Sequence, residues 1–216
     1  MGLGKGRKNI GKNIVFDRGK ERTDDVPDEV CSHYIKDEAM IRKISDAVFV
    51  SPEWVLLDLG VVPEDEGLRR ITERLDTPQE KEWAAQCFWH WHEYNMWHME
   101  GMEELVRSLK AAGYGIYLCS NASVRLLTCW QKVIPAADCF DGILFSGPEK
   151  CMKPQKEIYE RLFARFSLKP EECLFIDDQP LNIQGAAECG MRGYVYDGDR
   201  EKLKQWLSQE LGKTFS

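Results

Sequence analysis

The chain has 216 residues, a formal net charge of −7 and a sequence pI near 5.3. This length suits one large domain, or a core with a sizeable insertion, and such a chain can bury a core without cross-links. The acidic balance argues against nucleic-acid binding, because phosphate contacts need concentrated Lys and Arg. No run of about 18 apolar residues occurs, which argues against a membrane partner.

The number and spacing of the cysteines indicate the cellular compartment in which the protein is expected. The eight cysteines form no Cys-x-x-Cys pair and have no zinc-like spacing with the four histidines. Cys119 and Cys173 lie inside apolar runs, where a cysteine is typically a small core residue. Residues 1–12 lack the apolar stretch of a signal peptide. We therefore expect a cytoplasmic protein without a disulfide framework.

The N-terminal segment from Gly6 to Asn13 is one residue short of a phosphate-binding P-loop. That motif needs Ser or Thr after its lysine, a strand before the loop and a helix after it. Here Asn13 replaces the hydroxyl residue, and the strand follows the loop. We therefore reject a P-loop interpretation.

Short apolar runs alternate with helical patterns along the chain, which predicts a parallel sheet crossed by helices. The runs are largely apolar, as in strands that are buried on both faces. Strands are expected at 13–16, 114–119, 142–145, 173–176 and 193–196. Amphipathic helices are expected at 102–113, 157–166, 181–190 and 201–212.

The segment from about 26 to 98 interrupts this alternation with helix formers in a helical period. Ligands of an open parallel sheet bind beyond the carboxyl ends of its strands, so an insertion after the first strand can cover the site. The predicted fold is an α/β, Rossmann-like parallel sheet of about five strands, flanked by helices and carrying an inserted helical cap. The predicted domains are a core of residues 1–25 and 99–216 and a cap of residues 26–98.

Polar residues follow four of the expected strands. They are Asp17, Ser120 with Asn121, Lys153, and Asp177 with Asp178. Taken singly, a Ser-Asn pair is also an ordinary turn or helix cap, and a Lys-Pro pair in a loop is usually solvated. The adjacent aspartates are more informative, because two carboxylates at the end of a buried strand repel unless a cation neutralises them. Together, three carboxylates, a lysine and a serine predict phosphoryl transfer through an aspartyl-phosphate.

Four segments in this order resemble the motifs of the haloacid dehalogenase superfamily of hydrolases. The resemblance is to the branch with a small helical cap between the first two motifs, and it covers most of the chain. The segments are NIVFD, LCSNAS, FSGPEKCMKPQKEIYERL and CLFIDDQPLNIQGAAECGM.

The resemblance implies a Mg²⁺ site. Asp17 and Asp178 would bind the metal directly, and Gly19 would bind it through its backbone carbonyl. Asp177 would act through a metal-bound water, and Asn182 would steady the metal loop.

The resemblance also implies catalytic and substrate-binding residues. Asp17 would be the nucleophile, and Ser120 and Lys153 would take part in catalysis by binding the phosphate. Asn121 would join them in binding substrate. Related phosphatases carry a second aspartate two residues after the nucleophile as a general acid, and here that position is Gly19.

The loop after Asp17 departs from the family pattern. Three charged residues, 20–22, stand where relatives have an apolar run, and unpaired charges are costly to bury. Asp24 and Asp25 are alternative acids, although solvated turn residues are the simpler interpretation.

The expected cap is rich in aromatic residues. They are Trp83, Phe88, Trp89, Trp91, Tyr94 and Trp97, with His90, His92 and His98 among them. A substrate-binding surface is one interpretation, but aromatic residues at helical spacing are most often core. His90 and His92 do not share a helix face and make a poor metal pair.

These observations predict a Mg²⁺-dependent phosphatase of a small phosphorylated metabolite, such as a sugar phosphate, acting as a monomer or homodimer. The alternative is a catalytically impaired relative that binds a phospho-ligand or a protein partner, which the charged residues 20–22 keep open. Metal-free dehalogenase chemistry is disfavoured by Asp177 and Asp178, whose uncompensated charges would oppose an anionic substrate. A mutase is disfavoured because it needs the missing general acid.

Overall fold

A computed structural model describes residues 11–18, 26–94 and 101–215. Its centre is one sheet with the strand order β3-β2-β1-β4-β5, and every neighbouring pair is parallel. The strands are β1 (Asn13–Phe16), β2 (Gly115–Ser120), β3 (Gly142–Phe145), β4 (Cys173–Asp177) and β5 (Arg192–Val195). The expected α/β sheet of five strands is therefore confirmed, with strand ends that differ by at most one residue.

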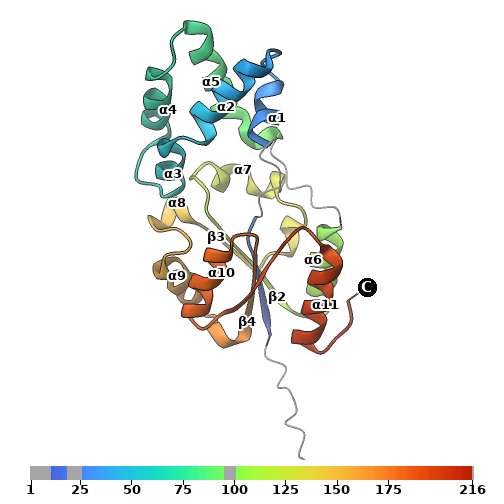
Figure 1. The fold of residues 1–216 in the computed structure, drawn as a ribbon. Coiled ribbons are helices and arrows are strands. Elements are labelled where there is room, and N and C mark those ends of the chain that lie inside the picture. Colours follow the sequence, from blue (N-terminus) through green and yellow to red (C-terminus); the bar gives the residue numbers. More distant parts are fainter. Residues whose placement is uncertain (1–10, 19–25, 95–100, 216) are drawn as a thin grey trace, which may run out of the picture.

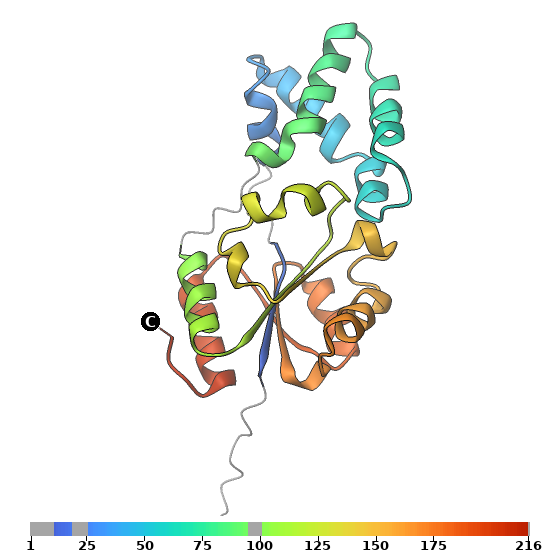
Figure 2. The same ribbon diagram turned by 180° about the vertical axis from the view of Figure 1, so that it is seen from behind.

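Helices cover both faces of the sheet, as Figures 1 and 2 show. Side chains alternate along a strand, so Ile14 and Phe16 of β1 enter one apolar cluster and Val15 enters the other. The helices α6 and α11 supply the first cluster, and α9 and α10 supply the second. These helices are α6 (Met102–Ala111), α9 (Lys156–Phe166), α10 (Pro180–Glu188) and α11 (Arg200–Leu211).

Of the six helices described between β1 and β2, the first five form a second body of structure beyond the carboxyl ends of the strands (Figure 1). We call them the helical layer. They pack on one another, and their apolar residues continue the larger cluster of the sheet. They are α1 (Val26–Ser32), α2 (Glu38–Phe49), α3 (Pro52–Asp58), α4 (Glu64–Glu73) and α5 (Pro78–Tyr94).

Two further helices lie where the sheet meets the helical layer. The helix α7 (Leu126–Val133) follows β2 and contacts α5, and the short helix α8 (Ser146–Glu149) follows β3 and contacts α3. Short 3₁₀ turns at Ala137–Cys139 and Pro170–Glu172 complete the described elements. In the described part of the chain, no helix has the length and apolar character that crossing a membrane requires.

The aromatic residues of the helical layer are largely internal. Phe88 and Trp91 are buried, and both contact the ring of Trp54 edge-on. The interpretation of these aromatic residues as core is therefore confirmed at both positions. His90 is exposed and pairs with Glu93. Trp97 and His98 lie outside the described residues.

Candidate active site

Asp17 lies in the middle of the carboxyl edge of the sheet. Its backbone N–H donates to the Ile176 carbonyl over 2.8 Å, which continues the pairing of β1 with β4 by one residue. Because β1 is the central strand, the Asp17 carboxylate has neighbours from both sides of the sheet. Its side chain is 13% exposed, so the group is largely shielded but still reachable.

Two more carboxylates meet Asp17 at this edge. Asp177 ends β4 and is buried, and Asp178 follows it and is half-buried. One carboxylate oxygen from each of these three aspartates lies within 4.8 Å of the other two. Burial raises the pKa of both Asp177 and Asp178, and the negative charge of Asp17 raises them further.

Lys153 is the cation of this cluster. Its side chain is 1% exposed, and its Nζ donates to Asp17 Oδ1 over 2.7 Å and to Asp177 Oδ2 over 2.6 Å. Burial opposes the charged ammonium, but the attraction of the two carboxylates outweighs it and raises the pKa of Lys153. The ammonium therefore stays charged and holds the two aspartates together.

Asn182 fixes the orientation of Asp177. Its Nδ2 donates to Asp177 Oδ1 over 3.1 Å and to Oδ2 over 3.0 Å. The backbone N–H of Gln179 also donates to Asp177 Oδ1. Tyr159, which is fully buried, donates its hydroxyl to the Asn182 carbonyl over 2.7 Å. Asn182 of α10 thus holds Asp177 directly, and Tyr159 of α9 holds Asn182 in turn.

The turn after β2 brings Ser120 and Asn121 to the same edge. Ser120 is the last residue of β2, beside the central strand, and is 3% exposed. The Asn121 side chain donates to the Lys153 carbonyl over 2.9 Å and accepts from the Lys153 N–H over 2.8 Å. Asn121 therefore orders the Lys153 loop, and its contact with substrate stays a prediction.

Several residues singled out in the sequence lie outside the described part of the chain. They are Gly19, Lys20, Glu21, Arg22, Asp24 and Asp25. The expected backbone ligand, the charged segment after Asp17 and the alternative acids are therefore all untested by the structure.

Two arginines that the sequence patterns did not single out lie where the sheet meets the helical layer. The guanidinium carbon of Arg18 lies 5.1 Å from the ring centroid of Trp91, and burial lowers the pKa of Arg18. Arg125 donates to Glu64 over 2.9 Å and stacks on Trp89. A lone arginine in a sequence gives no signal for such contacts, because they depend on how the layers pack.

The three aspartates fit a hard divalent cation. Carboxylate oxygens are the ligands that Mg²⁺ prefers, and Mg²⁺ commonly keeps several waters beside one or two protein carboxylates. Lys153 compensates part of the charge, but its single ammonium faces three carboxylates. A bound cation would neutralise the remaining negative charge.

Comparisons with known proteins agree with this geometry. Residues 66–190, more than half of the chain, match the sequence model of the haloacid dehalogenase-like hydrolases. A flavin mononucleotide hydrolase of Arabidopsis thaliana is 26% identical over an alignment of 164 residues, and the match covers 74% of this chain and 62% of that protein. A sesquiterpene phosphatase of Aspergillus oryzae is 32% identical over 92 residues, 43% of this chain and 47% of that protein. The chain thus spans about half to three-fifths of the length of these curated relatives.

Solved structures show the same fold. A predicted haloacid dehalogenase-like hydrolase from Porphyromonas gingivalis has a TM-score of 0.66 and 22% identity, and the match covers 92% of this chain and 98% of that one. A family enzyme from Bacteroides thetaiotaomicron, in complex with magnesium and inorganic phosphate, has a TM-score of 0.66 and 20% identity. That match covers 89% of this chain and 98% of the other.

Proposed function

Because this chain belongs to the haloacid dehalogenase-like hydrolases, we propose that it is a Mg²⁺-dependent phosphatase of a small phosphorylated metabolite. The observation that carries the proposal is the buried contact of Lys153 with both Asp17 and Asp177, beside Asp178. Curated relatives described as hydrolases or phosphatases of phosphorylated small molecules support it.

Asp17 is the nucleophile in this proposal. Its carboxylate oxygen attacks the phosphorus, the bond from phosphorus to the ester oxygen breaks, and the ester oxygen takes a proton from solvent water, so that the substrate leaves as an alcohol. Water then cleaves the aspartyl-phosphate, which releases inorganic phosphate and restores Asp17. Lys153 holds the attacking carboxylate in place and, with Ser120, binds the phosphoryl oxygens.

Mg²⁺ would be held by Asp17 and Asp178, with Asp177 beside them, and would neutralise charge on the phosphoryl group. Asn182 and Lys153 keep Asp177 in a fixed orientation for this purpose. The helical layer would act as a cap that limits water and admits small substrates, with the domain division at residues 26–98. Residue 26 borders a segment outside the described residues, and residue 98 lies within another. The cytoplasmic location and the monomeric or dimeric state also stay predictions.

The test is phosphate release from p-nitrophenyl phosphate, sugar phosphates and flavin mononucleotide, with Mg²⁺ and after chelation. Asp17→Asn should abolish turnover, because an amide cannot act as the nucleophile. Asp76→Asn is the matched control, since it makes the same change at an exposed carboxylate in the helical layer and should leave turnover unchanged. Absence of Mg²⁺-dependent turnover in folded wild-type protein would reject the phosphatase. Binding of Mg²⁺ and phosphate without turnover would instead support the catalytically impaired alternative.

A further inference from the structure

Ser146 connects the helical layer to the turn that carries Ser120 and Asn121. It begins α8 directly after β3, and it is fully buried. Its hydroxyl accepts from the backbone N–H of Ala122 over 2.9 Å and donates to the carbonyl of Asp58, the last residue of α3. One hydroxyl therefore bonds to the helical layer on one side and to the turn after β2 on the other.

The turn itself is held at both ends by the segment 146–153. The N–H of Gly147 donates to the Ala122 carbonyl over 3.0 Å, so both backbone groups of Ala122 are bound by residues 146 and 147. Asn121 is bound through its side chain to the backbone of Lys153. The positions of Ser120 and Lys153 thus depend on the same short segment.

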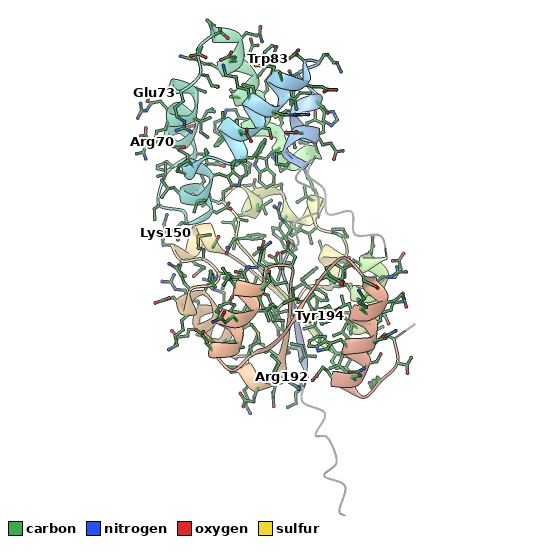
Figure 3. All side chains as sticks on the ribbon, in the orientation of Figure 1. Arg70, Glu73, Trp83, Lys150, Arg192 and Tyr194 are labelled. Atoms are coloured by element: carbon green, nitrogen blue, oxygen red, sulfur yellow. The ribbon has the colours of Figure 1, made fainter. Side chains whose placement is uncertain are left out.

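The end of α3 is fixed closely against this segment. Gly60 has a φ of +68°, and a Cβ at this position would collide with the Gly147 carbonyl oxygen. The Nζ of Lys150 donates to the Gly60 carbonyl, and Figure 3 shows Lys150 where α8 meets the helical layer. Such close backbone packing leaves little room for the helical layer to shift at this point without moving residues 146–150.

We infer that Ser146 is a positioning residue for phosphate binding, which transmits the docking of the helical layer at Asp58–Gly60 to the turn of Ser120 and Asn121. The inference rests on the proposed phosphatase function. The path runs from the Asp58 carbonyl through the Ser146 hydroxyl to the Ala122 N–H, each step being a hydrogen bond. When this hydroxyl is missing, the turn is no longer hydrogen-bonded to the helical layer through residue 146. The phosphate-binding groups of Ser120 and Lys153 then lose their alignment.

The experiment compares Ser146→Ala with Ser51→Ala. Ser51 is a matched control, because it is also a buried serine that accepts a backbone N–H, from Trp54, and donates to a backbone carbonyl, of Val48. Both variants lose one buried hydroxyl and should lose similar thermal stability. Neither hydroxyl is a substrate-binding group, so a purely structural role predicts the same kinetics for both.

The readouts are kcat, KM and the inhibition constant for inorganic phosphate in the presence of Mg²⁺, measured on folded protein. In Ser146→Ala, KM and the inhibition constant should rise about tenfold, as misplaced binding groups lower affinity, while Ser51→Ala stays near wild type. Lys150→Met is a second variant at the same contact, and it should raise both constants in the same direction.

Equal KM values and equal inhibition constants for phosphate in Ser146→Ala and Ser51→Ala would overturn the inference, while the phosphatase function would stand. Wild-type protein that neither turns over substrate nor binds inorganic phosphate would overturn both. If wild-type protein binds phosphate without turnover, the phosphate affinity of the three variants still decides the role of Ser146.

Discussion

Lys153 donates from its buried Nζ to Asp17 over 2.7 Å, across 136 positions of the sequence. The same nitrogen also bonds to Asp177, so the ammonium is the shared partner of two carboxylates from neighbouring strands. Removing it would leave both carboxylates in a shielded site without the Lys153 ammonium.

The change Lys153→Met should therefore destabilise the metal-free protein by about 3–5 kcal/mol, the range for breaking a buried ion pair from one side. Turnover should fall at least about 100-fold, because a charged group next to the reacting oxygens is lost. Urea unfolding and the phosphatase assay measure the two effects. Lys43→Met is the matched control, because Lys43 also bridges two carboxylates, Asp76 and Glu80, but is 40% exposed. A stability loss in Lys43→Met as large as that in Lys153→Met would contradict the expectation.

The raised pKa of Asp178 makes stability depend on pH and on metal. The folded protein holds the Asp178 proton more tightly than the unfolded chain does, mainly because burial disfavours the charged form. The resulting stability is present below the ordinary aspartate pKa of about 3.9 and is lost as pH rises through the folded pKa. The metal-free protein should therefore become less stable as the pH rises from the ordinary aspartate pKa to the raised pKa of Asp178 in the folded protein. Bound Mg²⁺ should reverse this loss of stability.

We expect the increase in Tm caused by Mg²⁺ to be larger at pH 7.5 than at pH 5, since protons compete with the metal for the carboxylates. Asp178→Asn should be at least as stable as wild type without metal at pH 7.5, and it should show little response to Mg²⁺. Thermal unfolding at both pH values, with Mg²⁺ and with a chelator, measures this. An Asp178→Asn variant with the full wild-type response would show that Asp178 is not a ligand.

The gathering of the site residues could be predicted from the sequence. Parallel strands deliver the residues that follow them to one edge of the sheet, so Asp17, Ser120 and Asp177 had to converge once the strands were recognised. The burial of Lys153 could not be read in this way. It lies in a loop, and its position depends on the bonds that Asn121, from the turn after β2, makes to its backbone.

The contacts between the helical layer and the core were not predictable from the sequence. Ser146 is a single polar residue between apolar and glycine neighbours, and Glu64 is one of three successive acidic residues. No period or spacing indicates their partners, which come from segments 24 to 88 positions away. The helix α7 was also missed. Its residues Leu126, Cys129, Trp130 and Val133 are buried or half-buried and recur at the helical spacing i, i+3, i+4 and i+7, so the sequence did carry a signal for this helix.

The pair of Glu64 and Arg125 should contribute to docking of the helical layer. Their side chains are 23% and 17% exposed, and the guanidinium also lies over the ring of Trp89, at 4.5 Å from its centroid. A double-mutant cycle of Glu64→Gln and Arg125→Gln should give a coupling free energy of about 1 kcal/mol, at the upper end for ion pairs that retain some exposure. Urea unfolding of the four proteins measures it. A coupling near zero would show that the ion pair adds nothing beyond the stacking on Trp89.

Gly60 should tolerate no side chain, for two reasons that can be separated. Its φ of +68° is unfavourable for other residues by roughly 1–2 kcal/mol, and a Cβ would also collide with the Gly147 carbonyl. Gly212 has a nearly identical φ of +65°, and a Cβ there would have no atom within 4 Å. Gly212→Ala therefore measures the backbone strain alone.

Gly60→Ala should be less stable than Gly212→Ala by more than about 1 kcal/mol, because residues 58–60 must move away from α8 to relieve the collision. The same movement would stretch the bond from Ser146 to the Asp58 carbonyl, so Gly60→Ala should also weaken the binding of inorganic phosphate. Urea unfolding gives the stability difference, and inhibition by phosphate gives the affinity. Equal stability of the two variants would mean that the helical layer shifts freely at this point, and phosphate affinity should then be unchanged in Gly60→Ala.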